Sequence, residues 1–440
     1  MSLIDDKWEL LFDRYKIAKK VSESGLFYIT ADQIREFKEP RLMTKFDTRE
    51  SLPKVFGGKL GILPVTRGSY VIGEFDLYND FPEEYSAGIS PEQNRRHITR
   101  FSVPDWYETI DTAEIRSEAS AINVMGIAGM LDEFLGEKGF RQTVSGRMAS
   151  GQFEFSVDGG LGKFAMDDTK PCLNRIHVNN SQVEIDGGFE SRESFAIIEG
   201  KNVVHSNFLV RQLYYPYRLW ENKLRKPVRP VFLVYSNNIF RLMEYEFTSL
   251  EHYNSIRLVQ EKLYSLEDTE ITKEALYGVW QQAEVKPEPD VTFIQADSFD
   301  KVISLTEHLK ERPLSAPEIA ERFGFRERQS DYYYNACKYL GLAEKKKDGD
   351  GVVRVRLTER GRGLLKLRYK PRQLEYVKLI LEHRIFHELF EETLHTGSLP
   401  EKRRICQKMQ ELHVCGPNLI QRRASSVAGW LRWMMGLAEM

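Results

Sequence analysis

The sequence predicts a multi-domain α/β protein in which a mixed-sheet core lies between an N-terminal α+β unit and C-terminal helical modules. At 440 residues the chain is too long for one ordinary core. A helical pattern followed by a series of apolar, strand-like runs fills its middle. Helical periodicity dominates the C-terminal third. We therefore expect four domains, at 1–105, 106–295, 296–370 and 371–440.

The first domain should open with a helix, because Trp8, Leu11 and Tyr15 fall on one face at helical spacing. Thr30-x-x-Gln33 has the form of a capping box, which predicts a second helix starting at Thr30. Two strand-like runs, KLGILPV and SYVIGEF, follow across a short turn. This order of elements fits a winged helix, and a plain packing role fits it equally well.

The charge of the chain is unevenly distributed, although its net value is only −2. Residues 301–440 hold 27 Lys and Arg against 18 Asp and Glu, a net of +9, so the remainder is acidic. A basic C-terminal third suggests a polyanionic partner, although basic surfaces are also common without one.

We expect a cytoplasmic protein without a membrane segment. The N-terminal MSLIDDKWELLFDRYK carries charges where a signal peptide needs an apolar core, and no run nears the roughly 20 apolar residues of a membrane span. The four cysteines form no C-x-x-C pair, so reduced thiols are expected at Cys172, Cys337, Cys406 and Cys415.

A long helix is expected from Ala113 to Glu137, followed by the strands QFEFSV, RIHV, QVEIDGGFE and SFAIIEGK. A further helix then precedes VRPVFLVYS, a run so continuously apolar that we expect both of its faces to be covered. Segment 284–297 has the composition of a linker. These elements form the mixed sheet of the second domain.

Two of these strands carry the residues that point to chemistry. Side chains alternate along a strand, so Glu184 and Asp186 share one face of the first strand. Glu199 and Lys201 share a face of the next strand by the same rule. Pairing the two strands can bring Asp186, Glu199 and Lys201 together at the end of a rigid sheet. The alternative is that these charges cap an exposed hairpin.

This trio suits phosphodiester hydrolysis. Two carboxylates can hold Mg²⁺, which prefers oxygen ligands. The bound metal would lower the pKa of a water molecule and neutralise charge developing on the phosphate. A nearby lysine can orient that water or stabilise the same charge.

The segment resembles the PD-(D/E)XK nuclease superfamily, with Asp186, Glu199 and Lys201 at the positions of the motif's acid, acid and lysine. Ile185 stands where the motif's name has proline. The resemblance covers roughly residues 110–245, and the whole chain is similar to a type II restriction endonuclease. It implies Mg²⁺-dependent hydrolysis of double-stranded DNA that leaves 5′-phosphate and 3′-hydroxyl ends.

Further site residues follow from the same resemblance. Some relatives place a glutamate on the helix before the sheet, which Glu118 matches, with Glu114 as a substitute. Others carry a glutamine on the helix after the lysine, which Gln212 matches. The alternative for both is an ordinary solvated helix position. Glu184 could also reach the metal. Close to Gln212 in the sequence, four residues could line a DNA channel or simply pack, namely Tyr214, Tyr215, Tyr217 and Arg218.

Residues 299–368 look like a winged helix-turn-helix. Ser315-x-x-Glu318 is a capping box, Gly324 makes a turn, and a basic hairpin has the turn sequence Asp348-Gly-Asp-Gly351 at its tip. Such a unit places its third helix in the major groove and its wing on phosphates. The expected DNA contacts are Arg326, Arg328, Gln329 and Tyr332 on the helix, and Lys345, Lys346, Lys347, Arg354 and Arg356 on the wing. A protein–protein module is the alternative.

Three amphipathic segments end the chain and could form a second, diverged helix-turn-helix with Arg422 and Arg423 on its last helix. Together these features predict a type II restriction endonuclease that uses Mg²⁺ and, for a palindromic site, acts as a homodimer. One rival is a non-specific repair or defence nuclease of the same fold. The other is a DNA-binding regulator with an inactive nuclease-like core.

Overall fold

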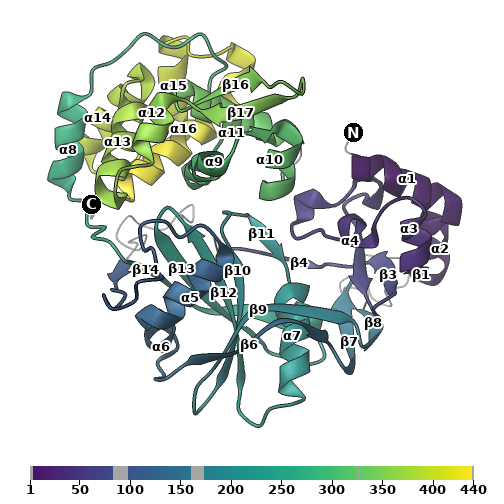
Figure 1. The fold of residues 1–440 in the computed structure, drawn as a ribbon. Helices are drawn as coiled ribbons and strands as arrows, with labels where there is room; N and C mark the ends of the chain where they lie inside the picture. The colour runs from purple at the N-terminus through teal and green to yellow at the C-terminus, as the bar shows by residue number, and fades with distance from the viewer. Residues whose placement is uncertain (1–2, 83–97, 160–172, 326, 439–440) are drawn as a thin grey trace. The chain divides into compact units, whose positions relative to one another are not determined.

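The computed structural model describes residues 3–82, 98–159, 173–325 and 327–438 (Figure 1). Their contacts divide the chain into two compact units. Unit 1 comprises Met1–Phe81, Val103–Tyr235 and Phe240–Lys262, and unit 2 comprises Pro82–Ser102, Ser236–Ile239 and Leu263–Met440. No described helix combines the length and apolar character needed to span a bilayer. The four domain boundaries stay a prediction.

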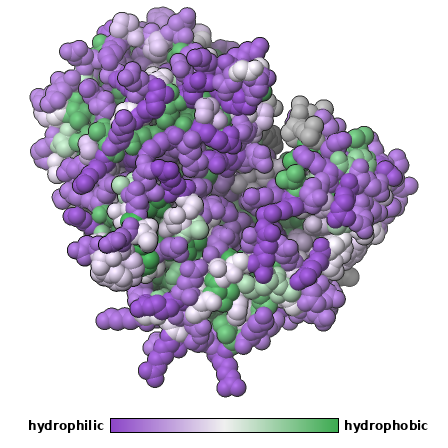
Figure 2. All heavy atoms as spheres, in the orientation of Figure 1, coloured by the Kyte–Doolittle hydropathy of each residue, from purple (hydrophilic) through white to green (hydrophobic). Residues whose placement is uncertain are grey.

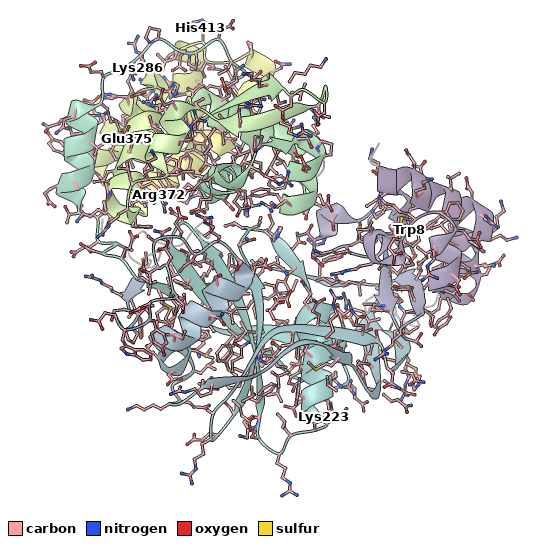
Figure 3. The ribbon with its side chains drawn as sticks, viewed as in Figure 1. Trp8, Lys223, Lys286, Arg372, Glu375 and His413 are labelled. Atoms are coloured by element: carbon pink, nitrogen blue, oxygen red, sulfur yellow. The ribbon has the colours of Figure 1, made fainter. Side chains whose placement is uncertain are left out.

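The N-terminal part of unit 1 is a small α+β body with a three-stranded sheet of order β1-β3-β2. The predicted capping box forms, since the Thr30 side chain accepts the backbone N–H of Gln33 and the Gln33 side chain accepts that of Thr30. Trp8 lies in its apolar core (Figure 3). The elements are α1 (Leu3–Tyr15), α2 (Ile17–Ser24), β1 (Leu26–Thr30), α3 (Ala31–Arg35), α4 (Pro40–Met43), β2 (Leu60–Pro64) and β3 (Ser69–Glu74), with 3-10 turns at Arg49–Ser51 and Lys54–Phe56.

A seven-stranded mixed sheet follows, in the order β5-β14-β13-β12-β10-β9-β6, which confirms the predicted mixed α/β architecture. Strand β10 runs antiparallel to β9 and parallel to β12. In sheet order the strands are β5 (Ile98–Arg100), β14 (Ile256–Ser265), β13 (Ile239–Phe247), β12 (Val228–Ser236), β10 (Phe195–Lys201), β9 (Gln182–Glu190) and β6 (Arg141–Ala149). A 3-10 turn at Tyr253–Ser255 precedes β14.

Two strand pairs accompany this sheet in unit 1. Strand β7 (Gln152–Asp158) pairs with β8 (Leu173–Asn179), and β4 (Tyr78–Asp80) pairs with β11 (Asn207–Leu209). All five predicted core runs are therefore strands, but the expectation that all five join the mixed sheet is wrong, because β7 and β8 form a two-stranded sheet of their own. The mixed sheet instead contains β5, β6, β13 and β14, which the sequence analysis did not assign. Residues Val231, Phe232 and Leu233 of β12 are all buried, as expected for a strand covered on both faces.

The prediction of a single long helix from Ala113 to Glu137 is wrong. The chain forms two shorter helices, α5 (Glu118–Ala128) and α6 (Met130–Leu135). Helix α5 begins late because the Ser117 side chain caps it by accepting the backbone N–H of Ser120. It ends at Gly129, whose φ of +79° is the left-handed conformation that ends many helices. Apolar periodicity alone could not reveal this break.

Helices α5 and α7 (Arg211–Glu221) both pack against β9 and β10. Helix α5 approaches closely because Gly126 has no side chain, and a Cβ there would lie 2.7 Å from the ring of Phe189 on β9. Aromatic residues of α7, among them Tyr214 and Tyr215, fill the core on its side of the sheet. These contacts fix the two helices on the strands that carry the predicted motif.

Unit 2 is mainly helical and contains a second three-stranded sheet, of order β15-β17-β16. The Ser315–Glu318 capping box and the hairpin around Asp348–Gly351 form as predicted. The elements are α8 (Lys273–Gln282), α9 (Phe299–Glu311), β15 (Leu314–Ser315), α10 (Ala316–Phe323), α11 (Glu327–Tyr339), β16 (Ala343–Lys347), β17 (Val353–Leu357), α12 (Glu359–Leu364), α13 (Tyr369–Leu381), α14 (Arg384–Thr396), α15 (Lys402–Glu411) and α16 (Ile420–Met435), with a 3-10 turn at Pro417–Leu419.

The last helix shares a core with α9. The ring of Phe299 lies 5.0 Å from that of Trp430 and 4.2 Å from that of Trp433. Cys337, Cys406 and Cys415 are free thiols, whereas Cys172 lies outside the described residues. The visible face of the molecule is largely hydrophilic, with small apolar areas between polar ones (Figure 2).

Candidate active site

The candidate site lies where β9 and β10 stop pairing. Their antiparallel register runs from Phe195 opposite Glu190 to Ile198 opposite Gly187. Two residues further along β10, the backbone N–H of Gly200 no longer has a strand partner on β9. It donates instead to the carboxylate of Asp186, with 2.9 Å between Gly200 N and Asp186 Oδ2. Asp186 therefore terminates the ladder, and its side chain is held beside the last residues of β10.

The alternation of β9 breaks at the same point. Val183 and Ile185 are buried in the core cluster that contains residues of α7, whereas a Cβ at Gly187 would lie 3.0 Å from Ile122 of α5. Residues two apart in a regular strand point to the same side of the sheet. Ile185 instead points to the side of α7 and Gly187 to the side of α5, so the alternation shifts between them. The irregular register between β6 and β9 occurs in this stretch. Asp186 sits at this irregularity, which strict alternation did not predict.

Glu199 is the centre of the cluster. Its side chain is only 10% exposed, and Oε1 accepts a hydrogen bond of 2.7 Å from Lys201 Nζ. The same oxygen accepts one of 2.6 Å from Nε2 of Gln212 on α7. The two-residue spacing of Glu199 and Lys201 on β10 and the first turn of α7 thus bring three predicted residues into contact.

Glu118 joins the cluster from the other helix. It is the first residue of α5, and its Oε1 accepts the backbone N–H of Asn202 at 3.3 Å. The approach is close because Gly200 lacks a side chain, and a Cβ there would lie 3.4 Å from Cβ of Glu118. Glu114, the predicted substitute, precedes α5 and pairs with Arg116. Of the two glutamates, Glu118 is the one held at the end of β10.

The cluster holds more carboxylates than cations. Burial raises the pKa of Glu199 to about 8, with Asp186 adding to the rise and Lys201 opposing it. Burial also raises the pKa of Glu118. Burial disfavours the charged form of the lysine, but the carboxylates of Glu199, Asp47 and Glu118 outweigh it and raise the pKa of that ammonium group. A bound cation would relieve this accumulation of negative charge.

Asp47 was not predicted, although its charge acts on both Glu199 and Lys201. It belongs to the N-terminal body and is held beside β11, where its carbonyl accepts the backbone N–H of Leu209 at 3.0 Å. The buried Asn207 secures the following residues, since its Oδ1 accepts the backbone N–H of Arg49 at 2.8 Å. No local sequence pattern marks Asp47, because only the tertiary fold brings it to β10.

Other predicted residues are placed elsewhere. Glu184 is about half exposed and forms an ion pair of 3.2 Å with Arg147 on β6. Tyr214 and Tyr215 are fully buried, and their hydroxyls donate to the carbonyls of Leu250 and Pro64. The packing alternative therefore holds for these two tyrosines.

The donor chemistry of the cluster fits Mg²⁺. Asp186, Glu199 and Glu118 offer carboxylate oxygens, which Mg²⁺ prefers. Oε1 of Gln212 is buried and has no hydrogen-bond partner among the described residues, so an amide oxygen is also free beside Glu199. As they stand, no three His, Cys, Asp or Glu side chains of the described chain are grouped so as to hold a metal ion. The side chains thus have the oxygen ligands that Mg²⁺ prefers, and binding would require their carboxylates to move closer to one another.

In unit 2, the predicted helix contacts lie on α11. Arg328 and Arg422 each lie 5.8 Å from the ring centroid of Tyr332, so two arginines flank one aromatic ring. Gln329 is partly buried, and Arg326 lies outside the described residues. Arg423, next to Arg422 on α16, is buried.

The predicted wing contacts divide into two groups. Arg354 pairs with both Asp348, at 2.9 Å, and Asp350, at 2.7 Å. Arg356 also pairs with Asp348. Lys345 pairs with Asp331 of α11 at 2.7 Å. The remaining two lysines, Lys346 and Lys347, are exposed at the end of β16.

Three family models match consecutive segments of the chain. Each is described only as a domain of unknown function: DUF6996 over residues 5–72, DUF6997 over 73–265 and DUF7226 over 301–439. No curated protein and no solved structure matches the chain. Asp186, Glu199, Lys201, Glu118 and Gln212 all lie in the segment matched by the second model, and Asp47 lies in that matched by the first.

Proposed function

We propose that the chain is a type II restriction endonuclease that hydrolyses double-stranded DNA with Mg²⁺, leaving 5′-phosphate and 3′-hydroxyl ends. One observation carries this proposal. Asp186 on β9 and the pair Glu199 and Lys201 on β10 converge where the two strands part, and Gln212 and Glu118 reach the same point from two helices. An exposed hairpin capped by charges would not bury Glu199 and Lys201 together.

Each residue has a role that its contacts support. Mg²⁺ held by Asp186 and Glu199 would lower the pKa of a bound water and neutralise charge on the phosphate. Lys201 is positioned to stabilise the same charge or orient the attacking water. Gln212 holds the carboxylate of Glu199 in place, and the Gly200 N–H does the same for Asp186.

The proposed DNA reader is the winged helix-turn-helix of unit 2. Its helix, short strand, two helices and hairpin follow one another as in that module, with α11 as the recognition helix. Arg328, Tyr332 and Arg422 form a basic and aromatic group suited to DNA, with Lys346 and Lys347 on the wing. The N-terminal body has the same sheet order and could be a second such module. For a palindromic site, two-fold symmetry favours a homodimer.

Two other functions remain candidates. A non-specific repair or defence nuclease would use the same cluster without a defined recognition site. A regulator with an inactive core would bind DNA and leave it uncut, but it would have no reason to keep a buried lysine hydrogen-bonded to a buried glutamate, which is costly to maintain.

The test is incubation of the full chain with phage DNA and Mg²⁺, alongside Glu199→Gln and Lys201→Met. Matched controls are Glu193→Gln, an exposed residue before β10, and Lys223→Met, an exposed residue just beyond α7 (Figure 3). We expect discrete fragments from the unchanged chain and both controls, and at least about a thousand-fold loss in the two site variants.

Each result assigns one function. Discrete bands support the restriction endonuclease, and a smear supports the non-specific nuclease. DNA that is retarded but uncut under Mg²⁺ and Mn²⁺ supports the regulator and contradicts the proposal. Retained DNA binding by Glu199→Gln and Lys201→Met would show that the loss concerns the chemical step.

A further inference from the structure

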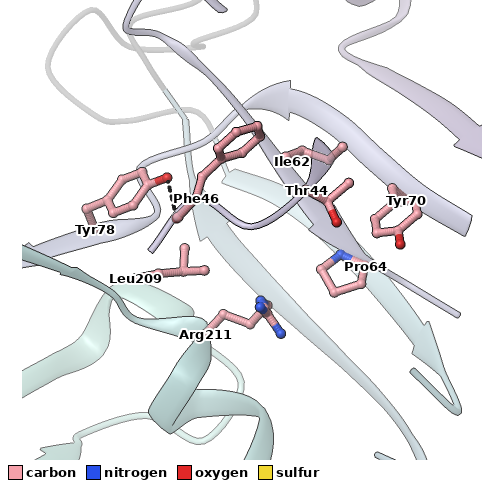
Figure 4. Close-up of a pocket in the computed structure, with 8 residues that line it drawn as sticks. All are labelled: Thr44, Phe46, Ile62, Pro64, Tyr70, Tyr78, Leu209 and Arg211. Atoms are coloured by element: carbon pink, nitrogen blue, oxygen red, sulfur yellow. Dashed lines mark hydrogen bonds between the residues drawn. The ribbon is translucent and has the colours of Figure 1, made fainter. Parts of the chain in front are cut away.

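A small cavity in unit 1 belongs to none of the roles described so far. Two of its lining residues, Phe46 and Arg211, directly precede Asp47 and Gln212 of the candidate site in the sequence. Its volume is about 40 Å³, and its lining includes Thr44, Tyr70, Tyr78 and Arg211 among apolar side chains (Figure 4). A cavity needs roughly 10 to 15 Å³ of such volume to hold one water molecule, so this one has space for roughly three waters. That is about the space required by the free oxygens of one phosphate group.

Arg211 is the unusual member of this lining. Its Nε is buried without a hydrogen-bond partner. The same holds for Nε of Arg218, Arg356 and Arg372, but each of those guanidinium groups binds through another nitrogen. Among the described residues no carboxylate pairs with Arg211. Arg211 as a whole is only half-buried, but a buried N–H without an acceptor is costly, and a bound anion would accept that N–H.

The hydroxyl groups of the lining show which donors are available to a ligand. Tyr78 donates to the carbonyl of Phe46 at 3.0 Å, as the dashed line in Figure 4 marks, and Thr44 donates to the carbonyl of Pro40 at 2.9 Å. The hydroxyl of Tyr70 has no partner within the described chain. Arg211 and Tyr70 are therefore the two free donors that line the cavity.

The remaining walls strengthen binding of an anion. Phe46, Ile62, Pro64 and Leu209 contribute apolar surface, and charges interact more strongly where water is excluded. We propose that this cavity binds one phosphate-sized oxyanion, held by Arg211 and Tyr70. The proposal does not depend on DNA cleavage. The oxyanion could be free phosphate or the terminal phosphate of a DNA strand, because both present the same group.

The test measures phosphate binding to the full chain without added metal. Thermal unfolding and titration calorimetry are recorded with sodium phosphate, and with sodium chloride at equal ionic strength. We expect a saturable rise in the unfolding midpoint with phosphate only. Arg211→Gln should weaken phosphate binding roughly ten-fold or more, and Tyr70→Phe by a smaller factor. Arg225→Gln, an exposed arginine beyond α7, should bind as the unchanged chain does.

A second arm compares a short single-stranded DNA carrying a 5′-phosphate with the same strand ending in a 5′-hydroxyl. A preference for the phosphorylated strand that Arg211→Gln abolishes identifies a DNA end as a source, and equal binding of both strands alongside phosphate binding identifies the free anion. Phosphate that acts no differently from chloride overturns the proposal. So does phosphate affinity that neither Arg211→Gln nor Tyr70→Phe changes. Neither result bears on the nuclease, which is tested by cleavage.

Discussion

Gln212 on α7 donates a hydrogen bond of 2.6 Å from its Nε2 to Glu199 Oε1, the oxygen that also accepts Lys201 Nζ at 2.7 Å. One carboxylate oxygen of the candidate site is thus shared by an amide and an ammonium group, while the amide oxygen of Gln212 has no partner within the described residues. The helix after the motif is therefore part of the site.

Replacing Gln212 with leucine should impair the site without removing a charged residue. The carboxylate of Glu199 would lose one of its two donors, and residues that orient metal ligands typically contribute about ten- to a hundred-fold to metal affinity or activity. We expect Gln212→Leu to need more Mg²⁺ and to cut more slowly, measured as cleavage rate against Mg²⁺ concentration. Gln142→Leu, an exposed residue of β6, is the control. An unchanged Mg²⁺ requirement in Gln212→Leu would contradict the assigned role.

Two glycine-to-alanine substitutions should change stability in opposite directions, because only one of the two glycines lies at a close contact between a helix and a strand. A Cβ at Gly126 would lie 2.7 Å from the Phe189 ring, so Gly126→Ala should destabilise unit 1 by about 1 to 3 kcal/mol. Gly278 in α8 has nothing within 4 Å of that position, so Gly278→Ala should gain about 0.5 to 1 kcal/mol from helix propensity. Chemical denaturation measures both. A neutral Gly126→Ala would mean that the helix is not tightly packed there.

The capping box of α10 should give unit 2 a pH-dependent stability. Burial acts to raise the pKa of Glu318, but hydrogen bonds from Ser315 and Arg312 outweigh it and lower the pKa to about 2 from 4.5. Because the folded pKa is lowered, the stabilisation is present above pH 4.5 and is lost as the pH falls toward 2. Glu318→Ala should therefore cost about 1 kcal/mol at pH 7, and less at low pH.

Denaturation of the unchanged chain and of Glu318→Ala at several pH values between 7 and 3 measures this difference. Glu321→Ala, an exposed residue in the same helix, serves as the control for loss of a carboxylate. A difference that stays constant over this range would show that the charge of Glu318 contributes nothing.

The wing should bind DNA more strongly once its own acidic residues are neutralised. Arg354 and Arg356 are paired with Asp348 and Asp350, so DNA phosphates must compete with these carboxylates. We expect Asp348→Asn combined with Asp350→Asn to raise DNA affinity several-fold and to steepen its salt dependence by about one unit for each arginine that is released.

Fluorescence anisotropy with a DNA duplex at several salt concentrations measures this effect. The control combines Asp290→Asn with Glu321→Gln and removes two exposed negative charges elsewhere in unit 2. An equal gain in the control would mean that net charge alone, and not release of the two arginines, explains the change. Loss of affinity in the wing variant would indicate that its ion pairs hold the wing in its binding conformation.

Local signals in the sequence determined much of the secondary structure. Both capping boxes formed at Thr30 and Ser315 because a cap depends only on residues three apart. The strands that carry Asp186 and Glu199 formed where the sequence has short apolar runs, and the Asp348–Gly351 turn formed at its Gly-rich segment, because both signals are local. The spacing of Glu199 and Lys201 was likewise sufficient to predict that they share a face.

Only the tertiary structure decided which residues meet. It selected Glu118 over Glu114, brought Asp47 to the site from the N-terminal body, and left the buried Nε of Arg211 without a hydrogen-bond partner beside a cavity. It also paired Arg354 with the wing's own aspartates. The physical reason is that each of these outcomes depends on a side chain's distance from, or burial against, residues that the fold places beside it. Periodicity and spacing in the sequence report only the order of residues along one element.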